Sequence, residues 1–256
     1  TDASTNEDTQ SAGGLVISRN GADGTEVTHF QITGITNGSL FQNDGTTAIN
    51  EGDFISFVQG NAGLKFTPAT NSIANGSFSV QASTSNVVGG LGGGTVTATI
   101  TVAPIADTPS VTNASTNEDT QTTSGLVISR NGADGAEVTH FQITGITNGS
   151  LFQNDGSTAV SNGDFITFAQ GNAGLKFTPS ANSIANGSFN VQSSTSNVVG
   201  GLGGGLAAGT ITVAPIADTP SVTNTSTNED TQSTNGLVIS RNGADGAEVT
   251  HFQITG

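Results

Sequence analysis

The sequence predicts an all-β protein built as a linear array of two-sheet sandwich domains. Three observations support this prediction: a 111-residue repeat, apolar residues that alternate with polar ones, and turn signals between the apolar stretches. The segment NGADGTEVTHFQITG at residues 20–34 returns almost unchanged at residues 131–145, and it starts again at Asn242. Solenoid repeats are shorter and cannot fold alone, whereas a unit of this length is typical of an independent domain.

Taking the phase of the repeat from the first residue, we expect sandwich domains at residues 1–111 and 112–222 and the first part of a third at residues 223–256. The two full units are identical at most positions. The third segment is too short to bury a core by itself, so we expect the sequence to be a window of a longer array. Near-identical consecutive units favour a repeated mechanical or spacing role, because an enzyme seldom needs its active site in series.

Two stretches of the first unit show the clearest strand pattern. In residues 27–33, Phe30 and Ile32 fall on one face and His29 and Gln31 on the other. In residues 95–102, apolar residues alternate with threonines, which predicts a strand with one buried face. The apolar residues of that strand are Val96, Ala98, Ile100 and Val102. Further short strands, rich in phenylalanine and β-branched residues, are expected at 53–57, 64–66 and 78–82.

Turn signals separate these stretches, and no segment has the pattern of an amphipathic helix. The signals are Asn-Gly at Asn37 and Asn75, Asp-Gly at Asp23 and Asp44, and the glycine-rich run 89–94, which we expect to be a flexible hairpin. Asn37 and Asn75 also begin Asn-Gly-Ser sequons, but the same tripeptides form tight turns, which is the interpretation we favour. About seven short strands in about a hundred residues predict an immunoglobulin-like or cadherin-like β-sandwich.

The composition excludes several functional classes. With 20 acidic and 5 basic residues, the chain has a formal charge of -15, so phosphate backbones and anionic membranes would repel it. It has no cysteine, which excludes disulfides and thiolate metal sites, and no apolar run long enough for membrane insertion. We expect no enzymatic activity, because no nucleophile lies next to a base. His29, His140 and His251 lie one repeat apart, so we expect exposed strand residues rather than a shared metal site.

Acidic residues recur at three places in each copy, near the expected boundaries between domains. The first place is the Asn-Glu-Asp triplet, with Glu7, Glu118 and Glu229 at its centre. The second is the linker aspartate of Pro-Ile-Ala-Asp-Thr-Pro, which is Asp107 or Asp218. The third is the Ala-Asp-Gly turn, which contains Asp23, Asp134 and Asp245. The linker has two prolines and no glycine, so we expect consecutive domains to be held close and end to end.

Here the sequence resembles the cadherins and the cadherin-like repeats of giant bacterial surface adhesins. The segments TNEDTQ, PIADTP and NGADGxEVTHFQITG stand where that family has an early glutamate, an acidic linker and an acidic turn. The resemblance implies one Ca²⁺ ion held by Glu7, Asp107 and Asp134, and a second held by Glu118, Asp218 and Asp245. The linker and the turn each have fewer acids than the family pattern, which implies fewer ions per junction. The alternative is that these acids cap turns.

Two functional classes remain. The first is a structural extender, the stalk repeat of a secreted or cell-surface bacterial adhesin or fibre, stiffened by calcium between neighbouring repeats of the same chain. The second is a self-assembling filament subunit, associating laterally or end to end through edge strands, or a module that binds a carbohydrate or partner. The chain has neither Trp nor Tyr, which disfavours an aromatic platform for sugars.

Overall fold

The computed structural model describes residues 2–256, and strands dominate the fold. The chain divides into two compact units, one formed by Thr1–Ala106 with Ala133–Glu137 and the other by Asp107–Gly132 with Val138–Gly256. The sequence alternation explains the strands, because every second side chain is buried in residues 29–32 and 65–68. The predicted all-β sandwich class is therefore confirmed.

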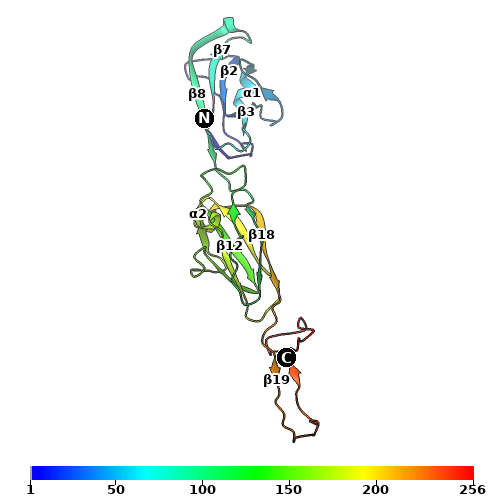
Figure 1. The fold of residues 1–256 in the computed structure, drawn as a ribbon. Coiled ribbons are helices and arrows are strands. Elements are labelled where there is room, and N and C mark those ends of the chain that lie inside the picture. The colour runs from blue at the N-terminus through cyan, green and yellow to red at the C-terminus, as the bar shows by residue number, and fades with distance from the viewer. Residues whose placement is uncertain (1) are drawn as a thin grey trace. The chain divides into compact units, whose positions relative to one another are not determined.

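The first unit consists of a five-stranded and a three-stranded sheet (Figure 1). The five-stranded sheet has the order β1 (Ala3–Asn6), β8 (Leu91–Ala103), β7 (Gly76–Ser83), β2 (His29–Thr36) and β5 (Phe54–Ser56). The other has the order β4 (Ala48–Ile49), β3 (Gly38–Phe41) and β6 (Lys65–Pro68). β1 runs parallel to β8, and all the other pairs are antiparallel.

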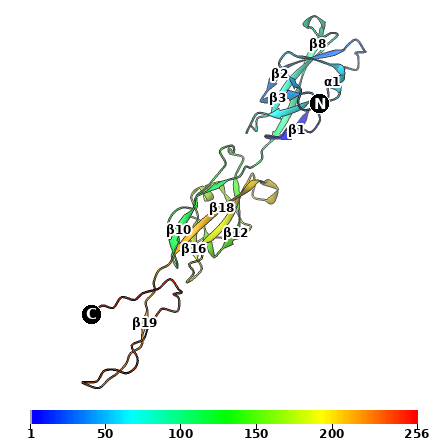
Figure 2. The ribbon, with the colours of Figure 1, turned by 90° about the vertical axis from the view of Figure 1, so that its right-hand side faces the viewer.

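The second unit repeats both sheets (Figure 2). Its five-stranded sheet has the order β10 (Ala114–Asn117), β18 (Leu202–Ala214), β17 (Gly187–Ser194), β12 (His140–Thr147) and β15 (Phe165–Thr167). Its three-stranded sheet has the order β14 (Ala159–Val160), β13 (Gly149–Phe152) and β16 (Lys176–Pro179). The register is the same in both units: Ala3 pairs with Ile100 in the first, and Ala114 pairs with Ile211 in the second.

The second unit has one further strand pair. β9 (Ser110–Val111) pairs antiparallel with β11 (Ile128–Ser129), with Val111 opposite Ile128. Ser110 and Val111 therefore belong structurally to the second unit, although a phase counted from the first residue ends a copy at Val111. The expected domain boundaries at 111 and 222 follow from counting the 111-residue repeat from the first residue, and another starting point would shift both of them.

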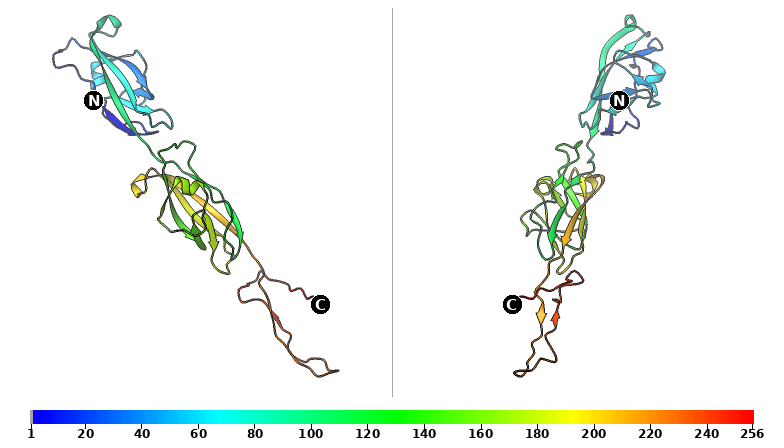
Figure 3. Two further views of the ribbon diagram at one scale, coloured as in Figure 1. Left: turned by 60° about the vertical axis from the view of Figure 1, so that its left-hand side comes forward. Right: turned by 45° about the vertical axis from the view of Figure 1, so that its right-hand side comes forward.

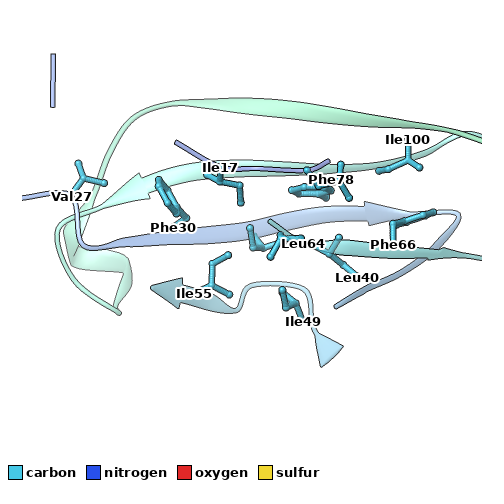
Figure 4. Close-up of a cluster of buried hydrophobic side chains, with 12 residues drawn as sticks. Ile17, Val27, Phe30, Leu40, Ile49, Ile55, Leu64, Phe66, Phe78 and Ile100 are labelled. Carbon is cyan, nitrogen blue, oxygen red and sulfur yellow. The ribbon is translucent and has the colours of Figure 1, made fainter. Parts of the chain in front are cut away.

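The core of the first unit lies between its two sheets (Figure 4). Its largest fully buried side chains are Phe30, Phe66, Phe78, Leu15, Ile32, Leu40, Leu64 and Ile100. The predicted inward face of β2 is confirmed, because Phe30 and Ile32 are buried and His29 and Gln31 are only half-buried. A positive φ places buried Leu15 in the left-handed region, and the same backbone recurs at Leu126.

The expected buried face of β8 is correct only in part. Ile100 and Val102 are buried, whereas Val96 is 71% exposed, because the first half of β8 extends past the core. The glycine-rich run is also more ordered than a flexible hairpin. Residues Val88–Gly90 form a short 3-10 helix (η1), and β8 begins at Leu91. The second unit has the same 3-10 helix (η2) at Val199–Gly201.

Each unit contains a short helix that the sequence pattern did not predict. These helices are α1 (Phe57–Asn61) and α2 (Phe168–Asn172). Ser56 Oγ accepts a hydrogen bond from the Gln59 amide at 3.2 Å, and Gln59 Oε1 accepts one from the Ser56 amide at 2.8 Å. This capping box stabilises a helix too short to show a hydrophobic period. No helix among residues 2–256 is long and apolar enough to cross a membrane.

The third copy shows what the core requires. Its strands β19 (Ser221–Val222) and β20 (Ile239–Ser240) pair as β9 and β11 do (Figure 3). Leu237 is nevertheless 61% exposed, whereas its counterparts Leu15 and Leu126 are 1% and 0% exposed. The later strands of a unit therefore bury the apolar residues of its first third, as expected for a segment too short to form a core.

Aspartates cap the hairpin turns of both units. Asp44 Oδ1 accepts hydrogen bonds from the Thr46 and Thr47 amides, each at 2.9 Å, and Oδ2 accepts one from the Thr47 hydroxyl at 2.5 Å. The Thr47 hydroxyl and the two amides stabilise the carboxylate and lower the pKa of Asp44 to about 2. The same contacts lower the pKa of Asp155 to about 2. The predicted Asp-Gly turn at Asp44 is confirmed.

We expect Gly76→Ala to destabilise the first unit. A Cβ added at Gly76 would lie 2.2 Å from Phe66 Cζ in the core, so the ring or the strand must move. Overpacking of this kind costs about 1–3 kcal/mol, measurable by denaturant unfolding. Gly21→Ala is the matched control, because a Cβ there meets no atom within 4 Å. Equal unfolding midpoints for the two variants would contradict the packing argument.

We expect the Asp44 carboxyl to titrate near pH 2 in the folded chain, as measured by NMR. Because its folded pKa lies below the unfolded value, its stabilising effect is present above about pH 4 and is lost as the pH falls through about 2. Thr47→Ala should raise the pKa of Asp44 toward its ordinary value and leave that of Asp155 unchanged. A Thr47→Ala chain in which Asp44 still titrates near pH 2 would exclude the hydroxyl as the main cause.

Candidate functional site

The early glutamate of each full copy is buried against its own unit. Glu7 follows β1 and is only 8% exposed. Its Oε1 accepts a hydrogen bond from the Ile105 amide at 2.6 Å, and its own amide donates to the Ala103 carbonyl at 3.0 Å. Since Ala103 ends β8, Glu7 fixes the backbone that leaves the last strand. The hydrogen bond is strong because its acceptor is an ionised carboxylate that is largely shielded from water.

The second unit repeats this contact. Glu118 is 7% exposed, its Oε1 accepts from the Ile216 amide at 2.7 Å, and its amide donates to the Ala214 carbonyl at 2.9 Å. The next residue also holds a backbone amide of its own unit: Asp8 Oδ1 accepts a hydrogen bond from the Asn71 amide at 2.8 Å. The counterpart bond, from the Asn182 amide to Asp119 Oδ1, measures 2.7 Å.

The linker aspartate and the turn aspartate meet at the start of the third copy. The Asp218 amide donates to Asp245 Oδ1 at 3.0 Å, and the Asp245 amide donates to the Asn242 carbonyl at 3.2 Å. Asp245 Oδ2 is buried and has no hydrogen-bond partner. An unsatisfied buried carboxylate oxygen is costly, so this atom is suited to a cation or another donor.

The structure brings together two of the three residues predicted for that calcium site. Asp218 and Asp245 are in contact, while the Glu118 carboxylate is engaged by the Ile216 amide. Within residues 2–256, no three acidic or histidine side chains are grouped closely enough to hold a metal ion. The buried Asp245 oxygen thus fits a cation, but the full carboxylate set is not assembled.

For the other predicted set, the structure shows the environment of each residue separately. Glu7 is engaged by the Ile105 amide, and Asp107 and Asp134 also have interaction partners. Asp107 and Asp134 belong to different compact units. At the first copy's turn, the Asp23 amide donates to the Asn20 carbonyl at 2.9 Å, as expected for a residue of a tight turn.

The predicted Asn-Gly turns also bind backbone groups. Asn37 has a positive φ of 56° and donates from Nδ2 to the Asn75 carbonyl at 2.8 Å. Asn75 Oδ1 accepts from the Val102 amide at 3.1 Å. Both side chains therefore hold strand ends together, as expected for residues whose role is in the turns.

Each histidine contacts the threonine before it. The Thr28 hydroxyl lies 2.9 Å from His29 Nδ1 and donates to the Thr84 carbonyl at 2.9 Å. The third copy has the same contact between Thr250 and His251 at 2.8 Å, although that copy has no packed core. The pair is therefore a local contact of adjacent residues.

Sequence reasoning missed a groove in the first unit. It has a volume of 710 Å³ and lies between residues 15–20 and strands β7 and β8.

Comparisons with known proteins show similarity in structure. No protein-family model matches the sequence, and no curated protein matches it. The crystal structure of human CDH23 EC21-23 is 15% identical, with a TM-score of 0.45, over 96% of this chain and 83% of that one. Mouse Cadherin-23 EC22-24 is 12% identical, with a TM-score of 0.41, over 83% and 63%. Drosophila N-cadherin EC1-4 is 9% identical, with a TM-score of 0.39, over 87% of this chain and half of that one.

Proposed function

We propose that this chain is an extender segment, the stalk of a secreted or cell-surface bacterial adhesin or fibre. The observation that supports the proposal is the repetition of the sheets with one register: His29 pairs with Ser56 and Ser83, and His140 pairs with Thr167 and Ser194. Near-identity extends over the whole unit and is not confined to one set of loops. A spacer role favours identical residues over the whole unit, whereas a binding role favours identical or variable residues at one set of loops.

The composition of the unit also favours a spacer over a carbohydrate-binding module. Sugar sites use exposed aromatic rings, and the only aromatic residue here is Phe. The phenylalanines Phe30, Phe66 and Phe78 are buried in the first unit, and Phe141, Phe177 and Phe189 are buried in the second. Their rings stabilise the sandwich and are not available to a ligand.

We further propose that Ca²⁺ stiffens the junctions, held by Glu118, Asp218 and Asp245 at one and by Glu7, Asp107 and Asp134 at the other. The buried Asp245 Oδ2 supports this, because Ca²⁺ accepts carboxylate, carbonyl and water oxygens. The contact between the Asp218 amide and Asp245 brings a second carboxylate-bearing residue to the same place. An ion that binds only the folded chain would also raise its stability.

Single-molecule pulling tests the extender role. A stalk under tension should have domains that unfold independently, so we expect two unfolding events with equal gains in length of about 35 nm, since each residue spans about 3.4 Å when extended. Two unequal steps, or a gradual extension without a force peak, would contradict two equivalent load-bearing units.

Calorimetric titration with Ca²⁺ tests the junction proposal. We expect the chain to bind Ca²⁺ and Asp245→Asn to lose one binding event, because the amide keeps the shape of the side chain and removes its charge. The matched control is Asp44→Asn, an exposed acid in a turn, which should bind like the wild type. An absence of calcium-dependent heat, or equal binding by both variants, would refute the junction site and leave a stalk stiffened by its prolines.

A further inference from the structure

The five-stranded sheet of each unit has its first and last strands side by side and parallel. In the second unit, β10 pairs with β18 over four residue pairs, from Ala114–Ile211 to Asn117–Ala214 (Figure 2). The other strand pairs of this sheet are antiparallel. In the first unit, β1 pairs with β8 over the four equivalent positions. The chain therefore enters and leaves the sheet along one parallel ladder.

Hydrogen bonds outside the ladder fasten both of its ends in the second unit. Before β10, Asn113 Oδ1 accepts a hydrogen bond from the Thr210 amide at 3.0 Å. After β10, Glu118 Oε1 accepts one from the Ile216 amide at 2.7 Å, and the Glu118 amide donates to the Ala214 carbonyl at 2.9 Å. These bonds continue the contact between the two strands beyond the four ladder pairs.

The first unit has the same fastening bonds, with one side chain exchanged. Asp2 Oδ1 accepts a hydrogen bond from the Thr99 amide at 2.9 Å, and Glu7 Oε1 accepts one from the Ile105 amide at 2.6 Å. The acceptor before the strand is thus a carboxylate in this copy and the amide of Asn113 in the other. Because the bond is present in both copies although the side chain differs, the contact itself is the shared feature.

The core shields one side of the ladder from water. Ile211 and Val213 of β18 are buried, and so is the Glu118 side chain that follows β10. Hydrogen bonds in such a low-dielectric environment are stronger than in water, and water does not readily replace them. The bond from the Ile216 amide also has an ionised acceptor, which makes it stronger than a bond between neutral groups. Breaking this contact is therefore slow.

A pull on the two ends of the second unit acts on opposite ends of this ladder. Force enters β10 at Ala114 and leaves β18 at Ala214, and these residues belong to the first and the last of the four pairs. The bonds of a parallel ladder are evenly spaced, so strands pulled in this way must slide and load all the bonds together. Strands pulled apart at one end would instead break the pairs one after another.

We infer that the parallel ladder is the element that resists tension in each unit, and that the glutamate after its first strand, Glu7 or Glu118, is a load-bearing residue. The inference rests on the proposed extender role and says which contact sets the unfolding force. It assigns the glutamates a function that needs no metal ion, because their acceptor oxygens hold the backbone that leaves the last strand. The three-stranded sheet carries load only after the ladder has broken.

Pulling the 256-residue chain in two directions tests the ladder. The chain has no cysteine, so two introduced cysteines give unique attachment points. Ser110→Cys with Ala217→Cys loads opposite ends of the ladder, whereas Ser110→Cys with Leu206→Cys loads one end, and all three positions are exposed. Forced unfolding follows the unfolding rate, so we expect the first pair to give a force about twofold or more higher. Equal forces would overturn the inference, while two equal unfolding steps would still support the extender role.

Glu118→Gln tests the fastening residue, with a calcium chelator present so that ion binding does not contribute. We expect one of the two unfolding steps to need less force and the other to keep its wild-type force, because only the second unit loses the charged acceptor. Asp155→Asn is the matched control: it also accepts backbone hydrogen bonds in the second unit, but outside the ladder, so both forces should stay unchanged. An unchanged force in Glu118→Gln, or an equal fall in both variants, would overturn the inference.

Discussion

Each unit depends on one close approach between its two sheets, where a phenylalanine ring meets glycines. Phe66 on β6 is fully buried, and a Cβ added at Gly76 of β7 or at Gly38 of β3 would lie 2.2–2.3 Å from its Cζ. The ring therefore occupies the space that side chains at these glycines would fill, and it joins the three-stranded sheet to the five-stranded one. Phe177 does the same with Gly187 and Gly149. With no disulfide available, this packing and the backbone ladders carry the stability of the sandwich.

The periodic part of the fold could be predicted from the sequence because side-chain alternation reports burial directly. It succeeds for Phe30 and Ile32, which lie over the core, and fails for Val96, because alternation shows which residues share a face but not where the opposite sheet ends. Helix α1 has too few residues for a period, and only the Ser56 and Gln59 spacing signals it. Local sequence also does not predict burial by itself: the residues around Leu237 are nearly those around Leu15, but Leu15 is buried by strands that come later in its unit.

The candidate site was harder to predict, because its contacts join residues far apart in sequence. The spacing of the acidic residues placed Asp218 and Asp245 at one predicted site, and the Asp218 amide donates a hydrogen bond to Asp245 Oδ1. It could not show that Glu118 is engaged by the Ile216 amide, since a backbone amide leaves no mark in a sequence. Acidic residues that recur together can bind an ion or hold the backbone, and the sequence alone does not separate these two roles for Glu7 and Glu118.

The segment Asp-Thr-Pro-Ser-Val shows why a sequence repeat and a folding unit need not coincide. At 107–111 it includes β9, which forms a two-stranded sheet with β11 of the second unit. The linker is thus a structural strand of the next unit as well as a spacer. Between the end of β8 at Ala103 and the start of β9 at Ser110, Pro104 and Pro109 restrict the backbone further. In the second unit, Ser110 and Val111 are therefore part of the sandwich that they precede.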